Sequence, residues 1–194
     1  FKGGVGKTTL AQNLAVAFVQ AGRKACIVDC DDSLNSLQWM KDRETEYPDL
    51  PKVSVIGERS DSKLPIVIRD LKKEHEVIVV DSPPSQSKIS QMILMISDLV
   101  LVPLLPRGSQ ETNTIVQLVE KIAGIEIAKD RKIPVYFLLN QYNQRIVHMQ
   151  EFKEQMRQSF SNQILKTHFS DLKAYYRASF LGMGVTEYLE VDDS

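Results

Sequence analysis

Short apolar runs alternate along the chain with longer segments in which apolar residues recur at helical spacing. Runs with the length of a buried strand lie at 24–30, 53–56, 77–81, 99–103 and 133–139, with a weaker one at 164–169. Segments whose apolar residues recur every three or four positions lie at 7–21, 63–74, 86–96, 110–124, 149–160 and 171–181. This pattern predicts strands and amphipathic helices in alternation. Polar residues dominate 40–52 and 57–63, which we expect to form loops.

Continuously apolar strands separated by helices are typical of a parallel sheet that is covered on both faces. The sequence therefore predicts an α/β fold, with a mostly parallel twisted sheet, helices on both faces and right-handed crossovers. A length of 194 residues suits one domain, and we expect residues 1–194 to form it. Hydrophobic residues make up 43% and charged residues 25%, which are ordinary values for a soluble globular protein.

Charge and cysteine content narrow the function classes. The net charge of -1 does not indicate a nucleic-acid-binding domain, although a local basic patch is compatible with it. Cys26 and Cys30 lie in or beside an apolar run, so we interpret them as buried small hydrophobic residues rather than a disulfide framework. No apolar run reaches the ~18 residues of a membrane helix, and no signal peptide is visible. We expect a cytoplasmic protein.

The strongest motif is KGGVGKTT, residues 2–9. Its glycines permit a tight turn that aims backbone N–H groups at a phosphate, and the helix that follows adds its positive end. Lys7 is expected to contact the β- and γ-phosphates, and Thr8 to ligate Mg²⁺. The residues expected to contact the nucleotide are Gly3, Gly4, Val5, Gly6, Lys7, Thr8 and Thr9. The motif predicts binding of ATP with Mg²⁺; the alternative is a glycine-rich turn without a ligand.

Only one residue precedes the phosphate loop, and this affects the number of strands expected in the sheet. A phosphate loop normally follows a strand, but only Phe1 precedes this one, so we expect a preceding strand that this sequence does not contain. Phe1 also stands where the usual G-x-x-x-x-G-K pattern has its first glycine, which indicates a variant loop.

With Lys2, the loop resembles the deviant Walker A signature K-G-G-x-G-K-[ST] of the ParA/MinD family. The resemblance implies a homodimer held together by ATP. It also implies a catalytic role for Lys2, which would reach the partner's γ-phosphate and stabilise charge there, as an arginine finger does. The alternative is a solvated lysine at the edge of the loop.

Two predicted strands end in aspartate, at the edge where ligands of α/β sheets bind. The first, IVDCDDS, resembles the family's D-x-D-P-Q switch: Asp29 and Asp31 match, whereas Asp32 and Ser33 replace the Pro and Gln. The resemblance implies that Asp31 orients the attacking water and that Asp29 supports the metal site. Without the proline the loop is less rigid. The alternative is a solvated pair or a helix N-cap.

The second strand, VIVVDSPPS, resembles the family's Walker B and second switch. Asp81 would hold Mg²⁺ through water, and Pro83 and Pro84 would stiffen the exit from the strand. Asn140 ends a later strand, and the resemblance implies that it contacts adenine. An ordinary asparagine in a turn is the alternative.

The last third of the chain contains the residues that indicate whether DNA or a membrane is the binding partner. The stretch YYRASFLGMGVTEY, residues 175–188, resembles the family's C-terminal helix and its G-x-[SG]-V-x-E ending. ParA-type members bind nonspecific DNA through basic residues near this region, whereas MinD-type members end in a basic amphipathic membrane helix. The acidic ending YLEVDDS favours the ParA type. The candidate DNA contacts are Lys153, Arg157, Lys166, Lys173 and Arg177. Solvated helix faces are the favoured explanation of these five residues.

The leading hypothesis is a ParA-type partition ATPase, which hydrolyses ATP slowly until a ParB-like adaptor stimulates it and which positions a plasmid, chromosome region or other cargo. One alternative is a MinD-like or cargo-positioning interaction switch of the same family with weak hydrolysis and no DNA role. An electron-transfer ATPase like the nitrogenase iron protein would need cluster-binding cysteines, and none follows Asp81. Small-molecule kinases and ligases with the same loop remain further alternatives.

Overall fold

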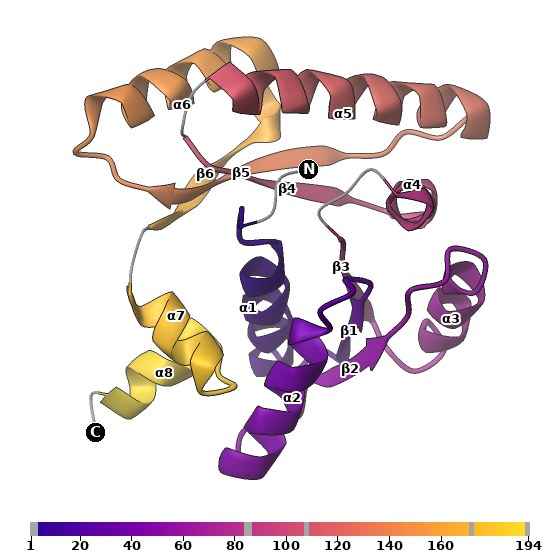
Figure 1. The fold of residues 1–194 in the computed structure, drawn as a ribbon, viewed down its shortest axis with the longest axis vertical. Coiled ribbons are helices and arrows are strands. Elements are labelled where there is room, and N and C mark those ends of the chain that lie inside the picture. The colour runs from indigo at the N-terminus through magenta and orange to yellow at the C-terminus, as the bar shows by residue number, and fades with distance from the viewer. Residues whose placement is uncertain (1–3, 84–86, 107–108, 171–172, 193–194) are drawn as a thin grey trace. The chain divides into compact units, whose positions relative to one another are not determined.

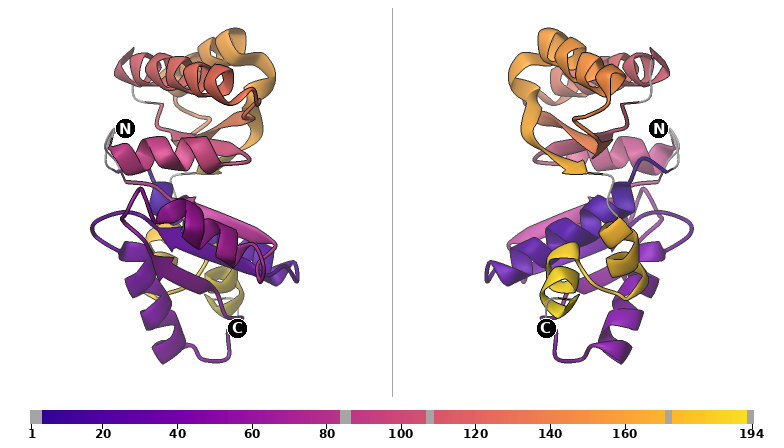
Figure 2. Two further views of the ribbon diagram at one scale, coloured as in Figure 1. Left: turned by 90° about the vertical axis from the view of Figure 1, so that its right-hand side faces the viewer. Right: turned by 90° about the vertical axis from the view of Figure 1, so that its left-hand side faces the viewer.

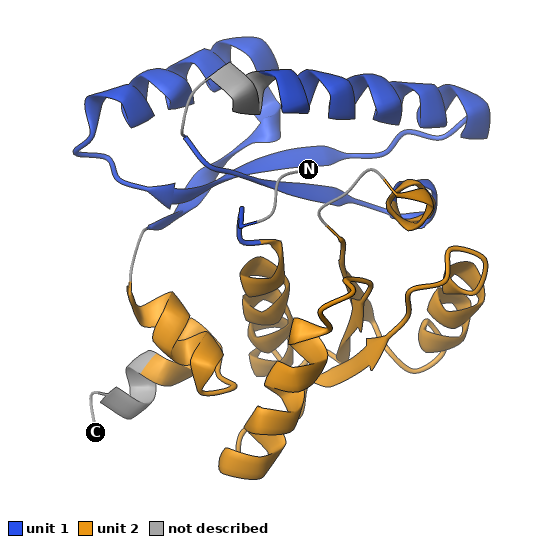
Figure 3. Ribbon diagram, viewed as in Figure 1, with its two compact units in different colours: residues 1–6, 94–171 blue, residues 7–93, 172–194 orange. Residues whose placement is uncertain are grey.

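The computed structural model describes residues 4–83, 87–106, 109–170 and 173–192. The chain divides into two compact units (Figure 3). Unit 1 comprises residues 1–6 and 94–171, and unit 2 comprises residues 7–93 and 172–194. Each unit contains a three-stranded parallel sheet. The expectation that residues 1–194 form one domain stays a prediction.

The sheet of unit 2 has the strand order β2-β1-β3. Its strands are β1 (Ala25–Asp29), β2 (Ser54–Gly57) and β3 (Val77–Asp81). All residues of β1 are buried, as its central position requires. In the register of the sheet, Asp29 pairs with Gly57 on one side and with Asp81 on the other. Two aspartates therefore end neighbouring strands side by side.

Unit 2 also contains helices (Figures 1 and 2). They are α1 (Lys7–Gln20), α2 (Asn35–Glu46), α3 (Leu64–Leu71), the first part of α4 (Lys88–Ile96), α7 (Lys173–Phe180) and α8 (Val185–Asp192). α1 packs against β1 and β3, and small buried residues such as Ala11 and Ala15 allow a close approach. A core cluster that includes Val16, Ile27 and Trp39 joins α1, β1 and α2.

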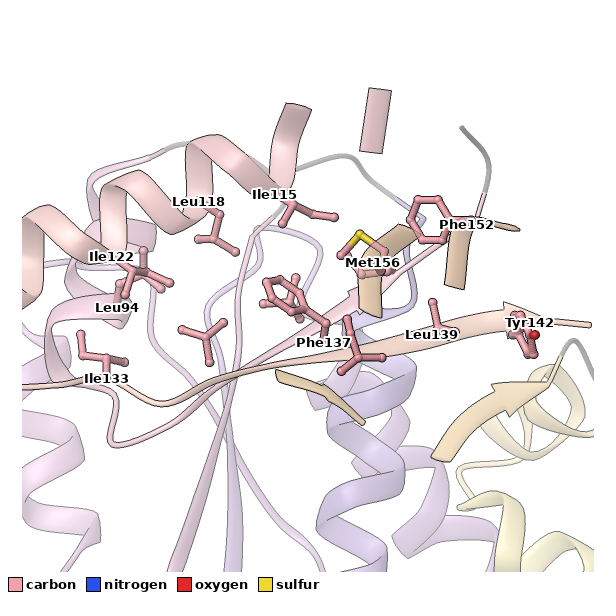
Figure 4. Close-up of a cluster of buried hydrophobic side chains, with 14 residues drawn as sticks. Leu94, Ile115, Leu118, Ile122, Ile133, Phe137, Leu139, Tyr142, Phe152 and Met156 are labelled. Carbon is pink, nitrogen blue, oxygen red and sulfur yellow. The ribbon is translucent and has the colours of Figure 1, made fainter. Parts of the chain in front are cut away.

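The sheet of unit 1 has the strand order β4-β5-β6. Its elements are β4 (Val100–Leu104), α5 (Ser109–Lys129), β5 (Val135–Tyr142), α6 (Val147–Phe160), the short 3-10 helix η1 (Ser161–Gln163) and β6 (Ile164–Ser170). Figure 4 shows the core, in which Leu118 and Ile122 of α5 and Met156 of α6 gather over Phe137 of β5. Phe137 is fully buried.

The predicted fold class is confirmed, with parallel strands and helices on both sides. One local expectation was wrong: residues 40–52, expected as a loop, contain much of α2, which ends at Glu46. Mean hydropathy hides this helix because two of its three buried residues are Ser36 and Arg43. The helix α8 was also missed, since it is short and follows the glycine-containing turn 181–184. Among the helices of the described ranges, none is long and apolar enough to span a membrane.

Candidate functional site

The phosphate loop adopts the backbone that its glycines permit. Gly4 has a φ of 80° and Gly6 a φ of 87°, in the left-handed region that disfavours other residues. α1 begins directly afterwards at Lys7, so Thr8 and Thr9 lie in its first turn. The first N–H groups of a helix have no partner within the helix and suit an anion. Two predicted members of the loop, Lys2 and Gly3, lie outside the described residues.

In unit 1, Asn140 near the end of β5 braces the loop. Its Nδ2 donates to the Val5 carbonyl at 2.8 Å, and its Oδ1 accepts from the Gln141 N–H at 3.0 Å. A Cβ at Gly6 would overlap Asn140 Nδ2. A glycine at position 6 is therefore required both by the backbone angle and by this contact.

In unit 2, Asp29 is fully buried at the end of β1, and both of its oxygens accept backbone hydrogen bonds. Oδ1 accepts from the Asp31 N–H at 3.1 Å, and Oδ2 accepts from the N–H groups of Ser36 at 2.8 Å and Leu37 at 3.3 Å. Burial raises the pKa of Asp29, and these N–H groups oppose the rise. The carboxylate thus caps the first turn of α2, which has no cap from its own N-cap residue, Leu34.

Asp81 at the end of β3 is equally buried but has a different environment. Its Oδ2 accepts from the Ser36 hydroxyl at 3.2 Å, whereas its Oδ1 has no partner with hydrogen-bond geometry among the described residues. Burial raises the pKa of Asp81 to about 6, and the Asp29 charge adds to the rise. The nearby Thr8 hydroxyl, Ser36 and the Lys7 charge oppose it. A buried carboxylate oxygen without a partner, close to a threonine hydroxyl, fits a hard cation such as Mg²⁺.

Lys7 and Asp31 complete the group of charges in unit 2. Burial lowers the pKa of Lys7, and the charges of Asp81 and Asp31 oppose this. Asp31 accepts from Ser33 twice, from its hydroxyl at 2.6 Å and its N–H at 3.0 Å, and these bonds lower the pKa of Asp31. Asp31 therefore stays charged and lies near Lys7. Ser33, which departs from the family pattern, holds the Asp31 carboxylate in place.

Sequence reasoning missed Ser36. This residue is fully buried, and it contacts both aspartates, through its N–H to Asp29 and its hydroxyl to Asp81. Its position seven residues after Asp29 would predict a contact with the aspartates only if α2 were known to start at Asn35. That start was not predicted.

The candidate DNA contacts are distributed over both units. Lys153 lies with its Nζ 5.0 Å from the centroid of the Tyr142 ring, and Arg157 and Lys166 are exposed in the same unit. Lys173 and Arg177 are exposed on α7 in unit 2. The structure therefore does not gather the five residues within one unit.

The profile of the CobQ/CobB/MinD/ParA nucleotide binding domain family matches residues 1–185. The chain is 28% identical over 132 residues to protein ParA of Rhizobium radiobacter, with 68% of the chain and 57% of the relative covered. It is 32% identical over 111 residues to the maintenance of carboxysome distribution protein A of Halothiobacillus neapolitanus, with 54% of the chain and 47% of the relative covered. The chain thus spans about half the length of these curated relatives.

Solved structures show the same fold at low identity. Apo McdA from Cyanothece matches with a TM-score of 0.75 and 15% identity, covering 98% of this chain and 91% of that one. A putative plasmid partition protein of Borrelia burgdorferi bound to AMPPNP matches with a TM-score of 0.72 and 15% identity, covering 99% and 93%. The cell division ATPase MinD of Pyrococcus furiosus matches with a TM-score of 0.69 and 21% identity, covering 96% and 87%.

Proposed function

The chain belongs to the CobQ/CobB/MinD/ParA nucleotide-binding family, and we propose that it is a ParA-type partition ATPase that binds Mg·ATP and dimerises with it. The observation that carries the proposal is the buried carboxylate of Asp81, whose unpartnered Oδ1 lies near the helix start that bears Lys7 and Thr8. A helix start with a lysine and a threonine near such a carboxylate is an arrangement that suits a metal-bound triphosphate.

The proposed roles in binding follow from these contacts. The N–H groups of residues 3–9 and the Lys7 ammonium would hold the phosphates, while Thr8 and Asp81 would hold Mg²⁺. A metal held there would supply positive charge to the phosphates. For Asp29, the contacts favour a positioning role, because both of its oxygens already bind N–H groups at the start of α2. Its proposed support of the metal is then indirect, through Ser36.

Asp31 is proposed to orient the attacking water. Its pKa is lowered by the bonds from Ser33, so it stays a hydrogen-bond acceptor at neutral pH. Lys2 is proposed to act across the dimer on the partner's γ-phosphate, as the loop signature implies. Asn140 is proposed to contact adenine with the second N–H of its amide, because the first binds the Val5 carbonyl.

The relatives support proposals about cargo. One relative is named chromosome partitioning protein ParA and another is named for the maintenance of carboxysome distribution, so chromosomes and carboxysomes are both cargo classes named among the relatives. We propose that the cytoplasmic ATP dimer binds nonspecific DNA, through basic residues such as Lys173 and Arg177. We further propose that a ParB-like adaptor stimulates a slow hydrolysis.

The first test is dimerisation measured by light scattering with Mg·ATP, comparing native protein with Lys2→Ala. We expect ATP-dependent dimers from the native chain and loss of dimerisation or hydrolysis in the variant. Equal dimerisation and equal hydrolysis in the two proteins would refute the proposed role of Lys2 in the partner's site. Calorimetry that finds no uptake of Mg·ATP by the folded native chain would refute the nucleotide site itself.

The second test is a mobility shift on random-sequence DNA with ADP, ATP and a nonhydrolysable analogue. A shift only with the triphosphates supports the ParA-type role, and a salt titration then reports the number of phosphate contacts. Binding to DNA in no nucleotide state favours the second candidate, an interaction switch with weak hydrolysis. The replacement of Pro and Gln by Asp32 and Ser33 supports this candidate, and single-turnover phosphate release with and without adaptors separates the two.

A further inference from the structure

The buried side of α2 carries an unusual set of residues. Ser36, Trp39 and Arg43 are its buried residues, with exposed fractions of 0%, 3% and 2%. Their spacing of three and four positions places them on one stripe along the helix. Each makes a polar contact with an element outside α2. The stripe therefore connects distant parts of unit 2 by directional bonds.

At its first turn, the stripe reaches the proposed metal site. The Ser36 hydroxyl donates to Asp81 Oδ2 at 3.2 Å, and the Ser36 N–H donates to Asp29 Oδ2 at 2.8 Å. The start of α2 is thus held by the carboxylates that end two neighbouring strands. A change in the position of the Asp81 carboxylate acts directly on this turn.

At its third turn, the stripe holds the C-terminal hairpin, defined as α7, the turn 181–184 and α8. Arg43 donates from Nη1 and Nη2 to the two oxygens of Glu187, at 2.7 and 2.5 Å, and Nη1 also donates to the Gly182 carbonyl at 3.2 Å. Trp39 Nε1 donates to the Met183 carbonyl at 3.3 Å. A Cβ at Gly182 would lie 2.5 Å from the backbone nitrogen of Arg43, so the two backbones are in close contact.

The hairpin is attached to α1 as well. Ser179 donates to Gln12 Oε1 at 3.1 Å, and the Val185 N–H donates to Asn13 Oδ1 at 2.8 Å. Both helices that hold the hairpin therefore begin at the proposed nucleotide site, α1 with Lys7 and α2 next to Asp81 (Figure 1).

We propose that α2 couples the metal site to the C-terminal hairpin, with Ser36 as the positioning residue at one end and the Arg43–Glu187 pair at the other. The proposal rests on the proposed Mg·ATP site. A metal held by Asp81 Oδ1 would act on the same carboxylate whose Oδ2 binds the Ser36 hydroxyl, so it would bias the position of the first turn of α2. A helix of this length is a rigid rod of about 18 Å. Its far end cannot shift alone, because a buried charge would lose its partner.

The coupling has a consequence for the surface of the hairpin. α7 exposes Lys173 and Arg177, together with the apolar rings of Tyr176 and Phe180. The occupancy of the metal site would therefore control the order of the surface that carries two of the proposed DNA contacts. Linkage requires the reverse effect too: loosening the hairpin weakens the binding of Mg·ATP by the same factor.

The first experiment measures hydrogen exchange of the amides of residues 176–188 with and without Mg·ATP. In native protein we expect the nucleotide to slow exchange by at least about fivefold, the lower end of typical coupling. Ser36→Ala, which removes only the hydroxyl, should reduce this protection well below that fivefold limit. The matched control is Thr45→Ala, which removes an exposed hydroxyl from the same helix and should keep the protection of native protein.

The second experiment measures the reverse effect by calorimetry. Glu187→Gln should weaken the binding of Mg·ATP by the same factor by which it loosens the hairpin. It should leave the binding of ATP in EDTA unchanged, because the proposed coupling acts through Asp81 as a metal ligand. In the Ser36→Ala background, Glu187→Gln should have no further effect. If Glu187→Gln does not fold, Trp39→Phe replaces it, because it removes the Nε1 donor and keeps an aromatic ring.

The outcomes separate the two proposals. Native protein that binds no Mg·ATP refutes the proposed function. Native protein that binds Mg·ATP without slowing exchange in the hairpin overturns the coupling alone, as does equal protection in native protein and Ser36→Ala. Factors that multiply in the double variant show that the two ends act independently and overturn the coupling too.

Discussion

Replacement of Arg43 by methionine tests the buried ion pair of unit 2. Arg43 and Glu187 are each 2% exposed, and the guanidinium also donates to the carbonyls of Gly182 and Pro51. Methionine is apolar and close to the volume of the arginine stem, so it removes the charge with little loss of packing. The Glu187 carboxylate then stays buried with only the Gly184 N–H as a partner among the described contacts.

The expected loss of stability follows from that unpaired charge. Removing one member of a buried pair destabilises a protein by about 3–5 kcal/mol. The control is Arg23→Met, which breaks an ion pair with Glu76 of similar length whose side chains are 61% and 48% exposed. An exposed pair contributes at most about 1 kcal/mol, so this variant should unfold nearly as the native chain does.

The assay is urea unfolding followed by tryptophan fluorescence. Trp39 is the single tryptophan of the chain, is buried, and has its ring centroid 5.6 Å from the Arg43 guanidinium carbon, so it reports on unit 2. A free energy of unfolding for Arg43→Met within about 1 kcal/mol of that for Arg23→Met would refute the reasoning. The double variant Arg43→Met/Glu187→Leu should be more stable than Arg43→Met, because it leaves no buried charge unpaired.

Three further predictions concern the site. Gly6→Ala should weaken Mg·ATP binding more than about tenfold by calorimetry, because alanine at a φ of 87° costs about 1–2 kcal/mol and its Cβ overlaps Asn140; native-like affinity would contradict this geometry. Asn140→Ala should weaken ATP and GTP by a similar factor if the amide mainly braces the Val5 carbonyl, and should change the ratio of the two affinities if it reads adenine. Asp81→Asn should stabilise the metal-free protein at neutral pH. The pKa of Asp81 is raised from 3.8 to about 6 on folding, so the protonated carboxyl group favours the folded state. This stabilisation is fully present below about pH 4 and is lost as pH rises through 6. Its size is about 1.4 kcal/mol for each pH unit that separates the unfolded and folded pKa values. Urea unfolding in EDTA at several pH values should show this slope in native protein and a smaller one in the variant, and equal slopes would argue against a protonated Asp81.

Much of the site follows from local sequence rules. Strands such as β1 are buried on both faces, so they appear in the sequence as unbroken apolar runs. These runs predict where the strands lie and that the sheet is parallel. Gly4 and Gly6 reveal a loop with left-handed backbone, and the start of α1 follows from the loop. Asp29 and Asp81 come directly after apolar runs, and parallel strands bring such residues to one edge.

By itself, then, the sequence determined the fold class, the phosphate loop and the two aspartates, because each depends on the local backbone or on hydrophobic periodicity. Only the tertiary structure decided that α2 is a helix, since Ser36 and Arg43 occupy its buried face and their burial is stable only with Asp81 and Glu187 as partners. Arg43 and Glu187 are 144 positions apart, and Asn140 and Val5 are 135 apart. A polar residue reads as exposed in a sequence until the folded chain places a partner beside it, and no local pattern encodes that distant partner.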